Sequence, residues 1–152
     1  MEIRPIEPSD APALIKAHDQ LKPETRRLRF FRMHPHMSER EAAFFATVDH
    51  VDREAFVVLD GKFIAAVGRY DRVEPDAAEV AITVGEPYQH HGLGTLLLDT
   101  LAARAREVGI TRFVADTMGD NRAAIGLIRH WAPNRKSSLD SGFMHFEMPL
   151  SA

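Results

Sequence analysis

The sequence of 152 residues contains no cysteine. That absence excludes disulfide bonds, thiolate zinc sites, iron–sulfur clusters and a cysteine acyl-enzyme intermediate. No apolar run approaches the roughly 18 residues that a membrane span requires, and the start Met1–Pro5 lacks the apolar core of a secretory signal. One domain with its own core accounts for a chain of this length. We therefore expect a single soluble domain over residues 1–152 that is cytoplasmic and has no membrane partner.

A strong excess of one charge is also absent, because 19 basic and 22 acidic side chains leave a formal net charge of −3. No long-range field draws such a chain to nucleic acid, so we expect no nucleic-acid partner. The chain has one local exception, an arginine cluster formed by Arg26, Arg27, Arg29 and Arg32 with the intervening Leu28, Phe30 and Phe31. This cluster fits either an anionic polymer or the solvated charged face of a helix end, and we favour the solvated face.

Apolar periodicity and turn signals predict the order of the secondary-structure elements. The predicted strands are Glu2–Ile6, Ala55–Leu59, Lys62–Tyr70, Ala77–Val84, Arg112–Thr117 and Phe143–Met148, and the predicted helices are Ala11–Leu21, one from Pro23, Ser38–Val48, Gly92–Val108 and Asn121–Trp131. Ser9 and Asp10 offer a helix N-cap, Ser38 and Glu41 fit a capping box, and Asp60-Gly61 is typical of a type I′ hairpin turn.

The order of these elements predicts the fold class. Three successive strands before residue 85 indicate an antiparallel meander, and the strand–helix–strand series after them indicates a right-handed parallel crossover. We expect an α/β fold of the α+β type. Its mixed, mostly antiparallel central sheet is flanked by helices and contains one β-α-β unit.

The most informative segment is Val84–Thr95, which joins a predicted strand to a long predicted helix. Gly92 and Gly94 allow successive backbone N–H groups to point outward at the positive end of the helix dipole, which suits a phosphate. A dinucleotide fingerprint would need a third glycine where Leu97 stands, and the lysine of a Walker loop is absent. The segment therefore predicts a phosphate-binding loop outside both nucleotide-binding classes.

Within this segment, Gln89–Gly94 matches the Q/R-x-x-G-x-G/A signature of the GNAT N-acetyltransferases, in the strand–loop–helix context of that family. Asn121–Ile125 resembles the N-x-x-A-x helix that lies beside the pantetheine arm of the cofactor in these enzymes. The resemblance implies a GNAT-type fold with a β-α-β acyl-CoA-binding unit, acetyl-CoA as co-substrate, and no metal. It implies cofactor contacts by Ile82, Val84, Gln89, His90, His91, Gly92, Leu93, Gly94, Thr95 and Asn121.

A narrower resemblance is to the catalytic domain of the bacterial Pat-type protein lysine acetyltransferases. It rests on Arg29-Phe30-Phe31, on Asp52-Arg53-Glu54, and on Ala78-Glu79-Val80-Ala81. The glutamate of the A-E-x-A strand is the assigned general base in those enzymes, which implies that role for Glu79 and a protein lysine as acceptor. His130–Pro133 replaces the Leu-Gly-Phe turn of these enzymes, so the resemblance does not extend to the tail.

The position of Glu79 suits the removal of a proton from an amine. A lysine amine with a pKa of about 10.4 is protonated at neutral pH, and freeing its lone pair costs about 4–5 kcal/mol. A nearby carboxylate can take this proton as the amine attacks. Strand alternation puts Glu79 on the same face as Ala81 and Thr83, the smaller and more polar side of the strand. The alternative is a solvated strand carboxylate that pairs with a neighbouring basic residue.

The remaining parts of the expected reaction follow from the family resemblance. A backbone N–H near Ile82–Val84 would polarise the thioester carbonyl, and Ile128 stands where many GNAT enzymes carry an acidic tyrosine. A thiol with a pKa of about 8.5 can leave without a dedicated donor. We expect direct attack of a primary amine on acetyl-CoA in a ternary complex, with protein lysine favoured and a small amine as the next choice. The alternative function is a non-catalytic acyl-CoA-binding module that binds a partner.

Other candidates are weaker. His34 and His36 alternate in a loop without further ligands at metal-binding spacing, and the adjacent His90 and His91 cannot both bind one metal with ordinary geometry. Phe30 and Phe31 of the arginine cluster fit either an acceptor entrance or the core. Exposed sheet edges would allow a homodimer.

Overall fold

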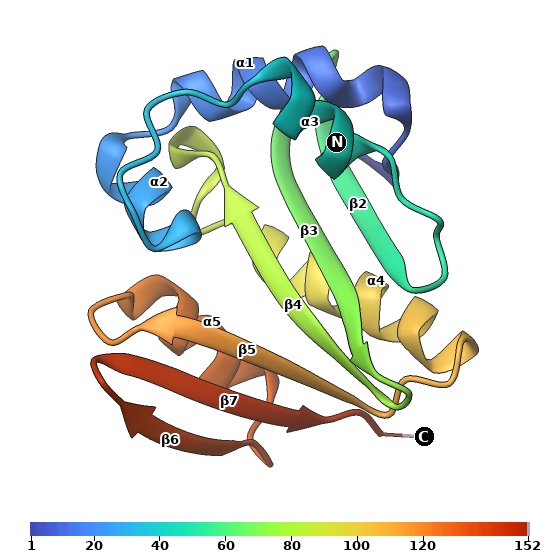
Figure 1. Ribbon diagram of the computed structural model, residues 1–152, viewed down its shortest axis with the longest axis vertical. Coiled ribbons are helices and arrows are strands. Elements are labelled where there is room, and N and C mark those ends of the chain that lie inside the picture. The colour runs from blue at the N-terminus through green and yellow to red at the C-terminus, as the bar shows by residue number, and fades with distance from the viewer. Residues whose placement is uncertain (152) are drawn as a thin grey trace.

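Seven strands form one mixed sheet in the computed structural model, which describes residues 1–151 (Figure 1). The strands lie in the order β1-β2-β3-β4-β5-β7-β6. They are β1 (Glu2–Pro5), β2 (Arg53–Asp60), β3 (Phe63–Glu74), β4 (Ala77–Val84), β5 (Arg112–Met118), β6 (Lys136–Asp140) and β7 (Phe143–Pro149). The helices are α1 (Ala11–Gln20), α2 (Pro23–Phe30), α3 (Glu39–Ala46), α4 (Leu93–Glu107) and α5 (Arg122–Trp131), with short 3₁₀ turns at η1 (Pro8–Asp10) and η2 (Glu86–Tyr88).

The sheet divides where β4 meets β5. These two strands are parallel, and they pair only over Ala77–Glu79 and Arg112–Val114. The other neighbouring pairs are antiparallel. Beyond Glu79 the two strands diverge, so the facing edge of each strand has no strand partner there (Figure 1). The predicted fold, a mostly antiparallel sheet with one β-α-β unit, is confirmed.

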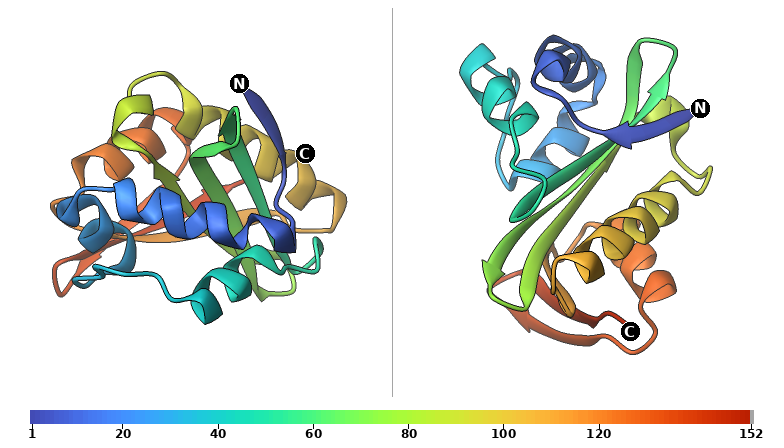
Figure 2. Two further views of the ribbon diagram at one scale, coloured as in Figure 1. Left: turned by 90° about the horizontal axis from the view of Figure 1, so that it is seen from above. Right: turned by 90° about the vertical axis from the view of Figure 1, so that its right-hand side faces the viewer.

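Helices cover both faces of this sheet (Figure 2). The helices α1, α2 and α3 lie on one face, and α4 and α5 lie on the other. The apolar stripe of α4 is buried against the sheet, with Leu97 and Leu101 fully enclosed. A side chain at Gly68 of β3 would meet Leu97 at 3.2 Å and Leu101 at 3.1 Å, so glycine permits the close approach of α4. Among residues 1–151, no helix combines the length and the apolar character needed to cross a membrane.

The hairpin between β2 and β3 differs from the predicted turn. Asp60 pairs with Phe63, so the two turn residues are Gly61 and Lys62 rather than Asp60 and Gly61. A type I′ turn needs positive φ at both central residues, but only Gly61, at φ 60°, has it. Positive φ at the first central residue alone is the type II′ pattern, which also suits the twist of the flanking strands.

Two predicted helix caps form only in part. The Ser38 hydroxyl accepts a hydrogen bond from the Glu41 backbone N–H at 3.0 Å, as a capping box requires. The Glu41 carboxylate, however, lies 2.8 Å from His34 Nε2, where it secures the loop before α3. Asp10 occupies the N-cap of α1 without capping it, because its carboxylate forms a two-pronged ion pair with Arg4 at 2.8 Å.

The sequence analysis did not predict one of the strands. β6, over Lys136–Asp140, pairs with β7 at the edge of the sheet, and each of its residues is exposed. An edge strand without a buried face carries no alternation of apolar and polar residues, so periodicity cannot reveal it. The predicted closing strand over Phe143–Met148 is present as β7.

A buried histidine, His18 of α1, makes the stability of the folded protein depend on pH. His18 is only 3% exposed, and its Nε2 lies 2.7 Å from the backbone oxygen of His34. Burial lowers the pKa of His18 more than this hydrogen bond raises it. The folded protein therefore keeps His18 neutral at a pH where the unfolded chain, with a histidine pKa of about 6.5, binds a proton. Stability from this group is complete above that pH and is lost as the pH falls below it.

We expect this histidine to lower the free energy of unfolding by at most about 1.4 kcal/mol between about pH 7.5 and pH 5.5. Urea unfolding at the two pH values measures the change. His18→Gln removes the titrating group and should flatten the dependence. His36→Gln, in the exposed loop before α3, is the matched control and should retain it. Equal pH dependence in the two variants would contradict the assignment to His18.

Candidate functional site

The junction between β4 and α4 has the geometry of an anion site. β4 ends at Val84, η2 follows, and α4 starts at Leu93 with Gly92 as its N-cap residue. The first helical hydrogen bond runs from Leu96 N–H to Gly92 O, at 3.1 Å. The backbone N–H groups of residues 92–95 have no acceptor within the part of the chain that the structure describes. These four donors at the positive end of a 15-residue helix favour a phosphate group.

The two glycines of the signature meet different requirements. Gly92 has φ 81°, and a Cβ built there would contact nothing within 4 Å, so its role is conformational. Gly94 has an ordinary helical backbone, but a Cβ at this position would lie 2.8 Å from Leu127 Cδ2. Glycine at 94 therefore allows α5 to pack against the start of α4.

A cavity of about 540 Å³ extends from this junction into the opening between β4 and β5. We call it the cleft; its walls come from α2, β4, the β4–α4 loop, α4, β5 and α5. Of the predicted site residues, those that line it are Glu79, Ile82, Val84, Gln89, His90, Gly92, Leu93, Gly94, Thr95 and Asn121. His91, which the family signature also implicated, is exposed and is not part of the cleft wall.

Two polar side chains of the predicted set fasten the backbone of the cleft. Gln89 Nε2 donates to the Val84 carbonyl at 3.1 Å and so ties the loop to the end of β4. The Asn121 Oδ1 atom accepts a hydrogen bond from Ala124 N–H at 3.1 Å and caps α5. The side-chain carbonyl of Asn121 is therefore engaged within the protein, whereas its amide nitrogen has no partner among residues 1–151.

Glu79 lies where β4 and β5 separate, at the last pair of their register. Its side chain is exposed to the cleft, and none of the described basic side chains comes within ion-pair distance of it. Partial burial raises the pKa of Glu79, and the negative charges of Asp116 and Asp71 raise it further, against a smaller opposite effect of Arg29. The predicted alternative, a strand carboxylate paired with a basic neighbour, is therefore not what the structure contains.

The opposite wall of the cleft adds an acidic residue that the sequence analysis missed. Asp116 on β5 is hydrogen-bonded to His145 Nδ1 on β7, and it lines the cleft across from Glu79. Glu79 pairs with Val114, and Asp116 follows two residues later, so the carboxylates of Glu79 and Asp116 lie on the same face of the sheet. The predicted parallel crossover places the two residues on neighbouring strands, but the register that brings them to the same face is fixed by no local sequence pattern.

The arginine cluster contributes to the mouth and the walls of the cleft. Arg27 reaches from α2 to Asp120 in the β5–α5 loop at 2.9 Å, and Phe31 packs edge-on against Phe143 of β7 with 5.3 Å between ring centres. Phe30 lines the cleft. The interpretation of the cluster as a solvated face is wrong for Arg29, which lies among cavity walls rather than in solvent. The reason is that α2, a helix of eight residues, contacts both β4 and β5, so the side of the helix that carries Arg29 faces inward.

A parallel strand pair that opens beside a helix start with free N–H groups is the arrangement that the resemblance to acyl-CoA-dependent acetyltransferases implies. The chain belongs to the acetyltransferase (GNAT) family, whose model matches residues 17–131. The acetyltransferase Pat of Mycolicibacterium smegmatis is 33% identical over 126 residues, which is 80% of this chain and 37% of that protein. The chain thus spans little more than a third of the length of this curated relative.

Solved structures show the same fold. The GNAT domain of S. lividans PAT superposes with a TM-score of 0.91 at 31% identity, over 97% of this chain and 89% of that one. The putative acetyltransferase yncA from Salmonella typhimurium, solved with its cofactor acetyl-CoA, has a TM-score of 0.78 at 16% identity, over 99% of this chain and 94% of that one. The resemblance to the GNAT family and to Pat-type enzymes is confirmed.

Proposed function

We propose that residues 1–152 form one catalytic domain that transfers an acetyl group from acetyl-CoA to a primary amine, with Glu79 as general base. The observation that carries this proposal is an unpaired carboxylate in the same cleft as the four free N–H groups of residues 92–95. The raised pKa of Glu79 also makes its carboxylate a better proton acceptor than an ordinary one.

The cleft fits acetyl-CoA on two grounds. The free N–H groups of residues 92–95 supply donors for the pyrophosphate without any charged side chain. The unpaired edge of β4 beyond Glu79 offers backbone groups to the amide-containing pantetheine arm, as a strand edge does to an added strand. Asn121 and the start of α5 would border this arm from the opposite side.

The reaction needs a proton acceptor and a polarised carbonyl. In our proposal the amine nitrogen bonds to the acetyl carbon, Glu79 accepts the proton of the amine directly or through water, and the carbon–sulfur bond breaks. A backbone N–H of the free β4 edge, at Ile82 or Val84, stabilises the developing oxyanion. Ile128 lines the cleft but has no ionisable group, so it supplies no acid, and the CoA sulfur leaves as a thiolate.

The acceptor that we favour is a lysine side chain of a protein. The similarity to Pat enzymes supports this choice, and so does the cleft itself, where Glu79 and Asp116 place two negative charges for a cationic group. A small amine is the next candidate.

Calorimetric titration followed by a turnover assay tests the proposed function. Acetyl-CoA and dephospho-CoA should bind with comparable affinity, because both carry the pyrophosphate, whereas acetyl-pantetheine should bind at least about tenfold more weakly. Free thiol should then appear when a lysine peptide or a small amine is added. Binding without thiol release by any amine would favour a non-catalytic acyl-CoA-binding module, and failure to bind acetyl-CoA would refute the proposal.

A further inference from the structure

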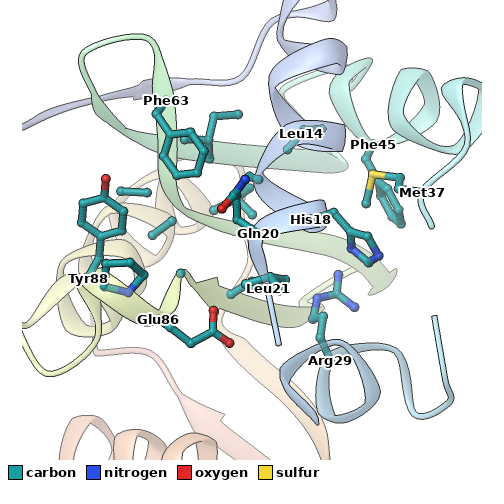
Figure 3. Close-up of a pocket in the computed structure, with 18 of the residues that line it drawn as sticks. Leu14, His18, Gln20, Leu21, Arg29, Met37, Phe45, Phe63, Glu86 and Tyr88 are labelled. Carbon is teal, nitrogen blue, oxygen red and sulfur yellow. The ribbon is translucent and has the colours of Figure 1, made fainter. Parts of the chain in front are cut away.

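A second cavity, of about 360 Å³, lies on the other side of β4 from α4, between the sheet and helices α1, α2 and α3 (Figure 3). Its walls are largely apolar and include Leu14, Leu21, Met37, Phe45, Phe63 and Ile64. The volume falls in the range of about 300–1,000 Å³ that is typical of sites for small molecules. Nothing in the proposed acetyl transfer requires this cavity.

Two arginines stand at one end of the cavity. Arg69 of β3 is only 6% exposed and donates one hydrogen bond, from Nη1 to the Phe45 carbonyl at 3.2 Å. Arg29 of α2 is half-buried, and its guanidinium lies over the ring of Phe30, 4.8 Å from the ring centre, without any hydrogen bond to the described residues. Figure 3 shows Arg29 beside His18 at this end, whereas Phe63 and Tyr88 lie at the other end.

Neither guanidinium has a carboxylate partner in the part of the chain that the structure describes. Burial, together with the positive charge of Arg29, lowers the pKa of Arg69 to about 10. Asp71 acts on both arginines only from a distance, because its carboxylate is bound by Arg53 at 3.1 Å. Buried cations are ordinarily paired with anions, so these two arginines favour an anionic ligand at this end of the cavity.

The two guanidinium groups indicate which anion would fit. A guanidinium presents a planar fork of N–H groups that matches the two oxygens of a carboxylate. The rest of the cavity wall is largely apolar, and its uncharged polar members are His18, Gln20, Thr83 and Tyr88. Glu86 also lines it, with Oε1 held by Lys22 N–H at 3.0 Å and by the Thr25 hydroxyl at 2.6 Å. A second negative charge on the ligand would be repelled by Glu86, so the ligand carries one carboxylate and an uncharged remainder.

We propose that this cavity binds a small monocarboxylic acid with an apolar chain, its carboxylate held by Arg29 and Arg69 and its chain directed toward Phe63. Arg29 and Thr83 line both this cavity and the cleft, so the bound acid lies next to the proposed catalytic site. The inference does not depend on the proposed function, because ligand binding here is measured without acetyl-CoA.

Titration of the chain with octanoate, octanol and octylamine, which share one chain length, tests the proposal. Octanoate should bind at least about tenfold more tightly than the alcohol or the amine. Across butanoate, hexanoate and octanoate, affinity should rise about fourfold per methylene until the cavity is full. Arg29→Met and Arg69→Met should each weaken octanoate binding by at least about tenfold.

Arg72→Met is the matched control, since Arg72 lies on the same strand as Arg69 but pairs with Asp52 at 2.8 Å and is not part of the cavity wall. It should leave octanoate affinity within about twofold of the wild-type value. Thermal unfolding gives a second readout. Arg69→Met removes a buried cation without a carboxylate partner, so its midpoint should match or exceed that of the wild-type protein.

Three outcomes would overturn the inference. These are equal affinity for the acid, the alcohol and the amine, no binding of any of the carboxylates, or unchanged octanoate affinity in both Arg29→Met and Arg69→Met. Because acetyl-CoA titration and thiol release are measured separately on the same proteins, failure of the acid site and failure of acetyl transfer are distinguishable.

Discussion

Glu79→Gln is expected to lower kcat by about 10²- to 10⁴-fold, the usual contribution of a general base. Glutamine keeps the size and polarity of the side chain, but it cannot accept the proton of the attacking amine. The dissociation constant of acetyl-CoA should stay within about twofold, because the anion donors of residues 92–95 lie on another element. Steady-state turnover and calorimetric titration of the two proteins measure these quantities.

The pH profile and a matched variant separate a base from a structural carboxylate. The acidic limb of kcat/KM in the wild-type protein should lie above the ordinary glutamate range, because burial and Asp116 raise the pKa of Glu79, and Glu79→Gln should lack that limb. Glu147→Gln is the control, since Glu147 lies on β7 in register with Val114, the residue opposite Glu79, but contacts Arg112 outside the cleft. Equal turnover of Glu79→Gln and Glu147→Gln across the pH range would remove Glu79 from the mechanism.

The second large effect is expected for Gly92→Leu, which should weaken acetyl-CoA binding by at least about tenfold. A leucine at φ 81° costs roughly 1–2 kcal/mol in backbone strain, and relief of that strain would turn the N–H groups of residues 92–95 away from the pyrophosphate. The side chain itself would also project into the open space in front of these donors. Isothermal titration with acetyl-CoA measures the loss.

Gly109→Leu provides a close control at the opposite end of the same helix. Gly109 has φ 83°, and a Cβ there also meets nothing within 4 Å, so both substitutions introduce similar backbone strain. Gly109 follows the C-terminus of α4 and is not part of the cleft wall. Gly109→Leu should therefore lower stability as Gly92→Leu does while leaving acetyl-CoA affinity unchanged. An equal loss of affinity in both variants would mean that general destabilisation, not the loop, is responsible.

Local rules of backbone geometry predicted the strand-to-helix junction of this site, whereas the roles of its individual residues came from the family resemblance. The strand-to-helix junction with Gly92 and Gly94 required only helix capping and the dipole, and the structure places both glycines where those rules do. Alternation along Ala77–Val84 put Glu79 on the smaller and more polar side of the strand, and in the structure Glu79 is exposed to the cleft whereas Val80 is buried in the core with Leu98 and Leu101 of α4. Such features are carried by residues that are close in sequence.

The parts that sequence could not provide depend on contacts between distant segments. Arg29 belongs to an arginine cluster that the sequence places on a solvated helix face, and only the packing of α2 against β4 and β5 brings it into the same cavity as Arg69. The Glu41 carboxylate contacts His34 Nε2, from a different segment of the chain, instead of its expected capping partner, the Ser38 backbone N–H. Asp116 becomes relevant only through the register of β4 with β5, which no local pattern fixes.

The short pairing of β4 with β5 has a mechanical consequence. Three register pairs join the two strands, and at the open end the Arg27–Asp120 ion pair and the Phe31–Phe143 contact bridge the gap. The two parts of the sheet are therefore joined by a short strand pairing at one end (Figure 1) and by these two side-chain contacts at the other. A ligand that contacts both parts of the sheet connects them across the cleft. The affinity of such a ligand and the separation of the two parts of the sheet are therefore coupled, and loss of the Arg27–Asp120 or Phe31–Phe143 contact would weaken binding.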